Sequence, residues 1–527
     1  MTALRAPKLL ALTAGLVAAL SPAWAQAPTS EAAVEGAVED GIENGAAEFT
    51  SAPDWLSDSI VAPHRNIATS ALPAPITAMP LDAPRLDAVG LLPFAVTGLP
   101  PDLWGASRPE DLAELFAALP VQGLPGMLDF SETLALAELE APAMGDTDRA
   151  LFLARLDMLL ARGALEPARA LIERAGPTDV ELFRRFFDVS LLTGQVERAC
   201  AALSANPDIE PSFPTRIFCL ARGGDWPAAA LSLGIGETLG FIEPEASEVI
   251  ARFLDPELFE GELPLPPDPR VTPLFYEMRA AIGERPASNG LPLAFAHSDL
   301  SAVAGWQAQV FAAERLIRSG AIAPQEWLAI ATARRPAASG ALWDRLRALQ
   351  RFDAAVLANN IDEVAEYLPD AAAEMRQAGL SVAFAELYGE PLMRLPLTGL
   401  SGRQAHLVGL LSASYETVAQ RATPADAEER FLLGIAMGQA GRPPSGNRTA
   451  AAVADAFAST QMPTRYAWLI NENRRGEALL MAIGVLMSEE RDANDIAAAL
   501  SLFRALGLES VARRTALQLL LTQDAAF

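Results

Sequence analysis

The stretch that decides the fold runs from residue 148 to residue 240 and carries one pattern three times. Its units read DRALFLARLDMLLARG at 148–163, VELFRRFFDVSLLTG at 180–194 and FPTRIFCLARGG at 213–224. Each unit ends on a glycine, and the spacings between these glycines are 31 and 30 residues: Gly163, Gly194 and Gly224. The pattern predicts three helix pairs, each joined by a tight turn in which the glycine adopts positive φ.

The residues that follow each glycine fall on one face of a second helix. An apolar residue stands two positions after the glycine, an alanine five positions after it and an aliphatic residue nine positions after it: Leu165, Ala168 and Ile172; Val196, Ala199 and Leu203; Trp226, Ala229 and Leu233. This spacing directs the three side chains towards the preceding helix, and the alanine lets the two helices approach closely. A period of about 30 residues is typical of stacked helical repeats. Coincidental spacing in an ordinary helix bundle is the alternative.

The turn and second-helix positions of these units resemble the tetratricopeptide family, over residues 148–240 of the 527. The chain lacks the paired tryptophan and tyrosine of that family's first helix, and Leu156 stands where the family has a glycine. The resemblance implies a degenerate, tetratricopeptide-like α-solenoid.

The rest of the sequence predicts an all-α protein with two helical blocks. Residues 107–254 form the expected N-terminal block and residues 298–527 the expected C-terminal block, the latter with a helix capped by Ser298 or Asp299. Between them, residues 255–297 hold eight prolines, which cannot continue helix pairs, so this segment is expected to be a strap or a hinge interrupted by a short helix at residues 273–282. The apolar residues of the expected strap favour packing across a groove: Leu258, Phe259, Leu263 and Leu265.

The first part of the chain predicts export. Arg5 and Lys8 precede an apolar run of twelve residues, and Ala23-Trp24-Ala25 fits a cleavage site, so residues 1–25 are expected to be a signal peptide cleaved near Ala25. The expected location is the periplasm. Residues 26–106, rich in alanine, proline and acids, are expected to form a flexible linker. Its apolar islands leave open whether parts of it dock: Trp55–Leu56, 91–94 and 103–104.

The charge excludes several classes of function. The chain has 40 basic and 66 acidic residues, a formal charge of −26, and its single lysine, Lys8, lies in the expected signal. Without another lysine there is no P-loop, Schiff-base or kinase chemistry. So acidic a protein is not expected to bind nucleic acid or anionic membranes. The expected mature part has no apolar run long enough for stable membrane insertion.

Two cysteines and three histidines are the remaining candidates for chemistry. Cys200 and Cys219 fall on adjacent helices of the repeat, and both a disulfide and two buried thiols are compatible with the sequence. His297-Ser298-Asp299 supplies three catalytic residue types, but contiguous side chains point in different directions. Trp306, Trp327 and Trp343 favour core packing over a binding cage. No cofactor or metal site is expected.

These observations predict a non-enzymatic scaffold that holds a basic or amphipathic segment of another cell-envelope protein. The layout of the chain resembles the periplasmic motility proteins that assist the flagellar stator in some alphaproteobacteria, which implies a stator subunit as the partner. A cofactor of cell-wall or outer-membrane assembly is an alternative. Another is an enzyme or small-molecule-binding protein with its site under the proline-rich segment, formed by Arg252, Glu260, Arg270 and Tyr276.

Overall fold

The computed structural model describes the chain over six ranges: residues 53–60, 85–143, 149–177, 179–206, 209–337 and 339–522. The expected signal peptide and much of the expected linker lie outside them. Within the described ranges all regular structure is helical, apart from two isolated β-bridges, so the fold is all-α. None of the described helices combines the length and the hydropathy needed to cross a membrane.

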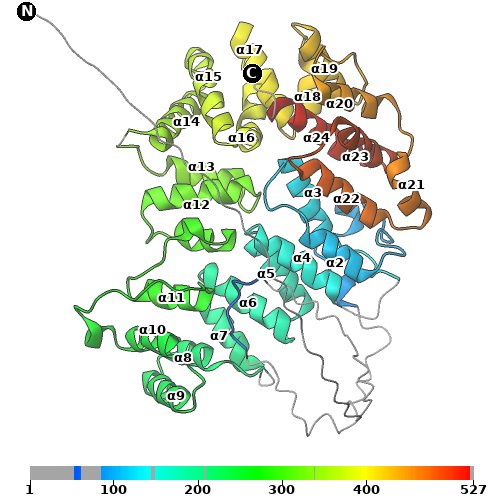
Figure 1. Cartoon of the computed structure of the whole chain (residues 1–527). Helices are drawn as coiled ribbons and strands as arrows, with labels where there is room; N and C mark the ends of the chain where they lie inside the picture. Colours follow the sequence, from blue (N-terminus) through cyan, green and yellow to red (C-terminus); the bar gives the residue numbers. More distant parts are fainter. Residues whose placement is uncertain are drawn as a thin grey trace, which may run out of the picture. The chain divides into compact units, whose positions relative to one another are not determined.

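The helices are labelled in chain order (Figure 1). They are η1 (Leu86–Ala88), α1 (Phe94–Thr97), α2 (Pro109–Ala117), α3 (Pro125–Leu136), α4 (Ala150–Ala161), α5 (Leu165–Ala175), α6 (Val180–Leu192), α7 (Val196–Ala205), α8 (Phe213–Arg222), α9 (Trp226–Thr238), α10 (Pro244–Leu254), η2 (Pro256–Phe259), α11 (Pro273–Ala281), η3 (Ser288–Gly290), η4 (Leu293–Leu300), α12 (Trp306–Arg318), α13 (Pro324–Thr332), α14 (Ala341–Leu357), α15 (Ile361–Gln377), α16 (Ser381–Arg394), α17 (Gly399–Leu411), α18 (Tyr415–Arg421), α19 (Ala427–Ala436), α20 (Arg448–Ala458), α21 (Thr464–Asn471), α22 (Arg475–Met487), α23 (Ala493–Ala505) and α24 (Glu509–Thr522).

The three predicted helix pairs are present as α4–α5, α6–α7 and α8–α9. The turn glycines have φ angles of 73°, 71° and 85°, which only glycine adopts without strain: Gly163, Gly194 and Gly224. The second helix of each pair begins two residues after its glycine. The alanines five positions after each glycine are fully buried: Ala168, Ala199 and Ala229. The periodicity therefore located these six helices correctly.

Two hydrophobic cores hold the fold together, and they do not coincide with the two expected blocks. The main core joins side chains from α2–α6 with side chains from η4 and α12–α24. The second core is built by α6–α11. Helix α6 serves both because it is apolar on two sides: Leu182, Phe186 and Val189 face the main core, whereas Phe183, Phe187 and Leu191 face the second.

The proline-rich segment, residues 255–297, contributes to both cores. Helix α11 within it packs on α6 and α10 and buries Leu274 and Met278 in the second core, while η4 packs on α12 in the main core. Pro256 and Pro273 occupy the first position of a helix, where proline is tolerated, so these prolines begin helices. The four apolar residues expected to pack across a groove have different outcomes. Leu265 is buried in the second core and Phe259 is partly buried, whereas Leu258 and Leu263 are 72% and 84% exposed.

The expected linker, residues 26–106, is corrected where the structure describes it. Residues 53–60 and 85–106 are part of the fold, with Trp55, Leu56, Leu103 and Trp104 buried in the main core. Backbone hydrogen bonds supplement this apolar burial. Ser57 N donates to Asp188 Oδ2 of α6 at 2.6 Å, and the guanidinium of Arg270 donates to Leu56 O at 2.7 Å. A few large apolar side chains with satisfied backbone groups are enough to dock a proline-rich segment.

Several helix boundaries differ from the sequence prediction. The helix expected to start at Ser298 or Asp299 begins instead at Trp306, because Ser298 and Asp299 belong to η4. The sequence pattern predicts no helix at the positions of α16 and α21. Prolines and glycines predict a turn over residues 120–126, but α3 already begins at Pro125. Pro391 lies inside α16 and Gly389 near it, so the sequence there has weak helix propensity that tertiary contacts override.

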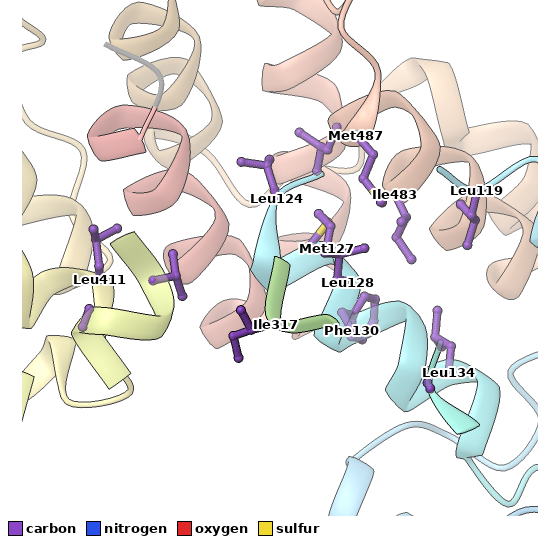
Figure 2. Packing of buried hydrophobic residues seen from close by; sticks show 14 of the residues in the cluster. Leu119, Leu124, Met127, Leu128, Phe130, Leu134, Ile317, Leu411, Ile483 and Met487 are labelled. Carbon is purple, nitrogen blue, oxygen red and sulfur yellow. The ribbon is translucent and has the colours of Figure 1, made fainter. Parts of the chain in front are cut away.

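The helical array closes on itself, because its last helices pack against its first. Helices α22 and α24 contact α2 and α3 (Figure 1). Around α3, Leu124, Met127 and Leu128 lie near Ile483 and Met487 of α22 (Figure 2). Hydrogen bonds fix the register of this junction: Gly126 N donates to Gln518 Oε1 at 2.7 Å, and Gly476 N donates to Leu103 O at 3.0 Å.

Closure depends on the absence of a side chain at Gly476. A β-carbon there would overlap the ring of the fully buried Trp104. We expect Gly476→Ala to lower the free energy of unfolding by about 1–3 kcal/mol, the usual cost of overpacking a core. Gly484→Ala on the same helix is the matched control: its β-carbon would lie 3.9 Å from Leu119, so the gain in helix propensity, up to about 1 kcal/mol, should dominate. Urea unfolding of both variants checks this, and equal stabilities would contradict the packing of Trp104 on Gly476.

Candidate functional site

The four residues expected to form a site under the proline-rich segment do not converge. Arg252 pairs with Glu248, Glu262 and Glu284, and Arg270 holds the docked residues 54–58. Tyr276 is buried against Phe295, with ring centroids 5.3 Å apart. Glu260 is exposed. These side chains therefore serve separate contacts within the fold.

The contiguous His297, Ser298 and Asp299 do not form a catalytic triad. His297 Nε2 lies 2.6 Å from Gly163 O, so it ties η4 to the first repeat turn, and burial lowers its pKa. Ser298 Oγ donates to Glu277 Oε1 at 3.3 Å, while Asp299 accepts from the hydroxyl of Ser288. Each side chain has a different partner, and a nucleophile with a base beside it is not assembled here.

The three tryptophans of the region after residue 300 pack within the fold. Trp306 and Trp343 lie with ring centroids 5.2 Å apart, and Trp306 Nε1 donates to Ile330 O at 2.9 Å. Trp327 is fully buried in the main core. These side chains contribute to packing, in agreement with the reading favoured from their helical spacing.

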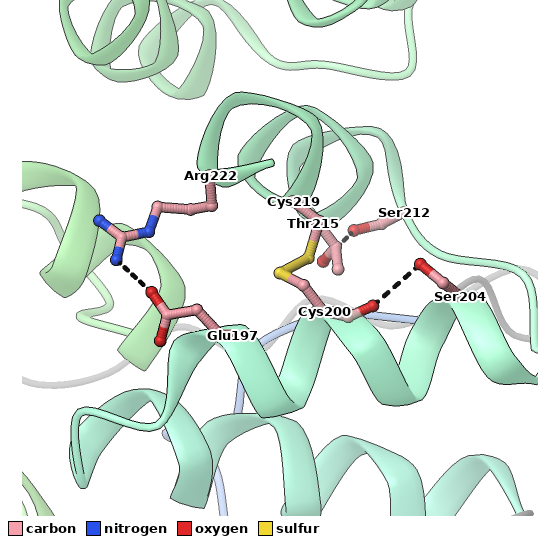
Figure 3. Close-up of a disulfide and its surroundings, with 7 residues drawn as sticks. All are labelled: Glu197, Cys200, Ser204, Ser212, Thr215, Cys219 and Arg222. Carbon is pink, nitrogen blue, oxygen red and sulfur yellow. Dashed lines mark hydrogen bonds and ion pairs between the residues drawn. A yellow bond between two sulfur atoms is a disulfide. The ribbon is translucent and has the colours of Figure 1, made fainter. Parts of the chain in front are cut away.

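A disulfide joins the second and third repeat units (Figure 3). It links Cys200 of α7 to Cys219 of α8, with the Cα atoms 5.4 Å apart. Next to it, Arg222 pairs with Glu197 at 2.8 Å, so a covalent bond and an ion pair both connect α7 to α8. The disulfide lines a pocket of about 520 Å³ between these helices. It thereby fixes the position of α8 and of the helix that packs on it, α9.

Helix α9 presents an apolar face that no other described helix covers. Leu231, Ile235 and Leu239 recur every four residues, so they share one side of the helix. They are 67%, 43% and 60% exposed, and Phe241, just beyond the helix, is 62% exposed. We call these four residues the α9 face. Only Ala229 and Gly236 of α9 are buried, which leaves most of this apolar helix in contact with solvent. Contiguous exposed apolar surface of this kind marks an interaction site.

The stretch of chain that contains the α9 face is strongly acidic. Residues 225–262 contain nine acidic residues and a single basic one, Arg252, which is already paired. Asp225 begins α9, Glu237 is the only charged residue within it, and Glu243 and Glu245 begin α10; all four are exposed. This segment therefore combines an exposed apolar strip with exposed carboxylates, here called the acidic border, which suits a partner that is apolar on one side and basic on the other.

Sequence reasoning missed the α9 face although a signal was available. Trp226 and Leu233 were expected to pack inward from α9, but Trp226 is 47% exposed and Leu233 is only partly buried. Helix α9 has one charged residue among thirteen and lacks an amphipathic pattern. An apolar helix at the edge of an array, without a polar face of its own, is the pattern that would have indicated an uncovered surface.

Comparison of the chain with protein-family models, with curated proteins and with solved structures finds no match.

Proposed function

We propose that this protein is a non-enzymatic scaffold of the periplasm, a helical-repeat protein that holds a basic, amphipathic segment of another cell-envelope protein. The observation that carries the proposal is the α9 face, an exposed apolar strip bordered by carboxylates. Recognition would follow the helix-in-groove mode, in which apolar side chains spaced three or four residues apart dock on an apolar strip.

The acidic border supports a basic partner over a second copy of the chain. Two copies that met through the α9 face would bring two strongly acidic segments together, and like charges at an interface are repulsive. The arginines of α8–α10 offer no compensation. Arg222 pairs with Glu197, Arg252 with three carboxylates, and Arg216 lies over the ring of Phe213. A segment rich in arginine or lysine would instead neutralise the border.

A designed peptide pair tests the recognition chemistry. The first is an amphipathic helical peptide with leucines at positions i, i+3, i+4 and i+7 and arginines elsewhere; the second has glutamates in place of the arginines. We expect the basic peptide alone to bind. We expect Leu231→Asp with Leu239→Asp to weaken this binding by roughly tenfold or more, because a buried leucine contributes about 1.5–3 kcal/mol. The matched control is Leu400→Asp, at a position 86% exposed outside the α9 face. Equal binding of both peptides, or binding that survives the double substitution, would contradict the proposal.

The natural partner can be identified by site-specific photo-crosslinking in living cells. A photoreactive amino acid at position 235 or 239 should capture one segment of an envelope protein, whereas the same residue at position 357, also exposed, should not. Capture of a stator subunit, together with deletion cells that carry intact but non-rotating flagella, would place the scaffold at the flagellar motor. Capture of a cell-wall or outer-membrane assembly protein would assign the same surface to that process. Crosslinks only to copies of this chain would overturn the proposal.

A further inference from the structure

A second candidate site lies at the junction where the array closes. It is a cavity of about 980 Å³, formed where the start of α3, the α12–α13 turn, the α15–α16 turn and the ends of α22 and α24 meet. We call it the junction cavity. Its volume is at the upper end of the range of small-molecule sites, about 300–1,000 Å³. The cavity is distinct from the α9 face, and none of its lining residues belongs to α8–α10.

One part of the lining is apolar. Side chains from four separate segments contribute, and Leu128, Ile317 and Met487 are among those drawn around α3 in Figure 2. Leu124 and Val382 add to this wall and are largely buried. A ligand in the cavity would therefore meet a preformed apolar surface.

The charged part of the lining has more arginines than carboxylates, in a chain of net charge −26. Four arginines and three carboxylates contribute: Arg318, Arg376, Arg491 and Arg514 with Asp129, Glu386 and Glu489. Two of these arginines form ion pairs. Arg514 Nη2 pairs with Glu386 at 3.1 Å, and Arg318 pairs with Glu314 at 3.1 Å.

The other two arginines have no carboxylate partner among the described residues. Arg491 donates only to the backbone carbonyl of Ser488, and burial lowers its pKa with no nearby charge to oppose the effect. Arg376 stands at the end of α15, half-buried, with no side-chain hydrogen bond to another described residue. A partly desolvated guanidinium without a counter-charge is costly, and an anion that enters the cavity would supply one.

None of the three lining carboxylates, Asp129, Glu386 and the exposed Glu489, forms an ion pair with the two arginines among the described residues. Asp129 faces the open space of the cavity and keeps 54% of its side-chain surface accessible. The protein around it still raises its pKa by desolvation, with Arg514 opposing the rise. Glu386 is held by Arg514 and by the backbone N–H of Ala413 at 3.2 Å. Arg376 and Arg491 thus remain the groups available to a ligand.

From the apolar wall and the two unpaired guanidiniums we infer that the junction cavity binds an amphiphilic anion, a molecule with an apolar body and a carboxylate or phosphate head. The head would contact Arg376 and Arg491, since guanidinium binds either group through paired hydrogen bonds. The apolar body would lie along Leu128, Ile317 and Met487. Such a ligand would contact α3, α12 and α22 together and would stabilise the closed array through mass action.

The test uses defined probes below their micelle concentrations. Calorimetric titration of the full chain with dodecanoate and with dodecyl phosphate should show one saturable site. The probe that binds more tightly tells whether the site prefers a carboxylate or a phosphate head group. Dodecanol, which lacks the anionic head, should bind at least tenfold more weakly. Acetate and inorganic phosphate, which lack the apolar body, should also bind at least tenfold more weakly. Equal binding of dodecanol would overturn the role of the arginines, and equal binding of acetate or phosphate would overturn that of the apolar wall.

Substitutions separate this site from nonspecific uptake. Arg376→Gln with Arg491→Gln should weaken the binding of the tighter probe at least tenfold. The melting temperature of the free protein should change little, because neither arginine has an ion-pair partner among the described residues and Arg491 loses only its hydrogen bond to the Ser488 carbonyl. Arg394→Gln, at a position 70% exposed on α16, is the matched control and should bind as the wild type does. Unchanged binding in the double variant would overturn the inference. Since the α9 face is untouched, binding of the basic peptide reports separately on the proposed function.

Discussion

Replacing Arg155 by leucine is expected to lower the free energy of unfolding by about 3–5 kcal/mol. Arg155 is 1% exposed and lies on α4, where its guanidinium donates to three backbone carbonyls: Ala135 O at 2.7 Å, Ala137 O at 3.1 Å and Asp87 O at 3.2 Å. Burial lowers its pKa to about 10, so it still carries its charge at neutral pH. Removing it leaves three buried acceptors without donors, each at a cost of about 1–3 kcal/mol, partly offset because a buried charge is also removed.

The effect of Arg155→Leu should be concentrated at residues 85–92, which pack beside Arg155. Asp87 belongs to η1, and Leu91 N donates to Leu136 O at 2.7 Å in the same region. Urea unfolding gives the loss of stability, and hydrogen exchange should show lost protection first at residues 85–92. Arg155→Lys keeps the charge, but one ammonium group cannot reach three carbonyls at once, so its loss should be intermediate. Arg394→Leu, at the exposed position on α16, should change stability by less than about 0.5 kcal/mol. A loss of that small size at Arg155 would contradict its structural role.

Removing the disulfide is expected to cost about 3 kcal/mol. Cys200 and Cys219 are 19 residues apart, and a loop of this length restricts the unfolded chain by about that amount. We expect Cys200→Ala with Cys219→Ala to show this loss in urea unfolding under oxidising conditions. Hydrogen exchange should localise it to α7–α10, because both cysteines pack against the second core and neither touches the main one.

Reduction provides the control for the disulfide. Dithiothreitol should lower the stability of the wild type to about that of the double variant and should leave the variant unchanged. Binding of the basic peptide to the α9 face should weaken in parallel, since the disulfide fixes α8 and α9 packs on α8. A wild type whose stability is insensitive to the reductant would show that the two thiols, although adjacent, contribute only as small buried apolar side chains.

The local part of the fold could be predicted from the sequence, because its determinants lie close together in the chain. Gly163, Gly194 and Gly224 fix turns between helices that contact their immediate neighbours, and the burial of Ala168 follows from its position relative to the turn. Asn359 is followed by Ile361 and Val364 at the same spacing, which predicts a turn with asparagine in place of the glycine, and its φ is 52°. Periodicity reports such contacts well because they are short in range.

The distant contacts could not be predicted in this way. The sequence predicts Trp104 as part of an isolated apolar pair in a flexible linker. Its packing could not be predicted, because Gly476, on which its ring packs, lies 372 positions further along the chain. The short helix at residues 273–282 could be predicted and is present as α11, but its burial in the second core against α6 and α10 could not. The α9 face and the junction cavity depend on which helices remain uncovered and which ones meet, and neither property is encoded in a local pattern.

The contact between Gly126 and Gln518 has a consequence for the order in which the molecule is made. These residues are 392 positions apart, so α3 lacks its final hydrogen-bond partner until almost all of the described chain has emerged. Pairings this remote form slowly, because the entropy of closing a long loop is lost before any contact forms. Until α22 and α24 have formed, the parts of α3 and of Trp104 that these helices bury remain exposed. Exposed apolar surface of this kind makes an unfinished chain prone to aggregation. The last two helical turns of α24, which contain Gln518, therefore supply a contact to α3 that can form only late.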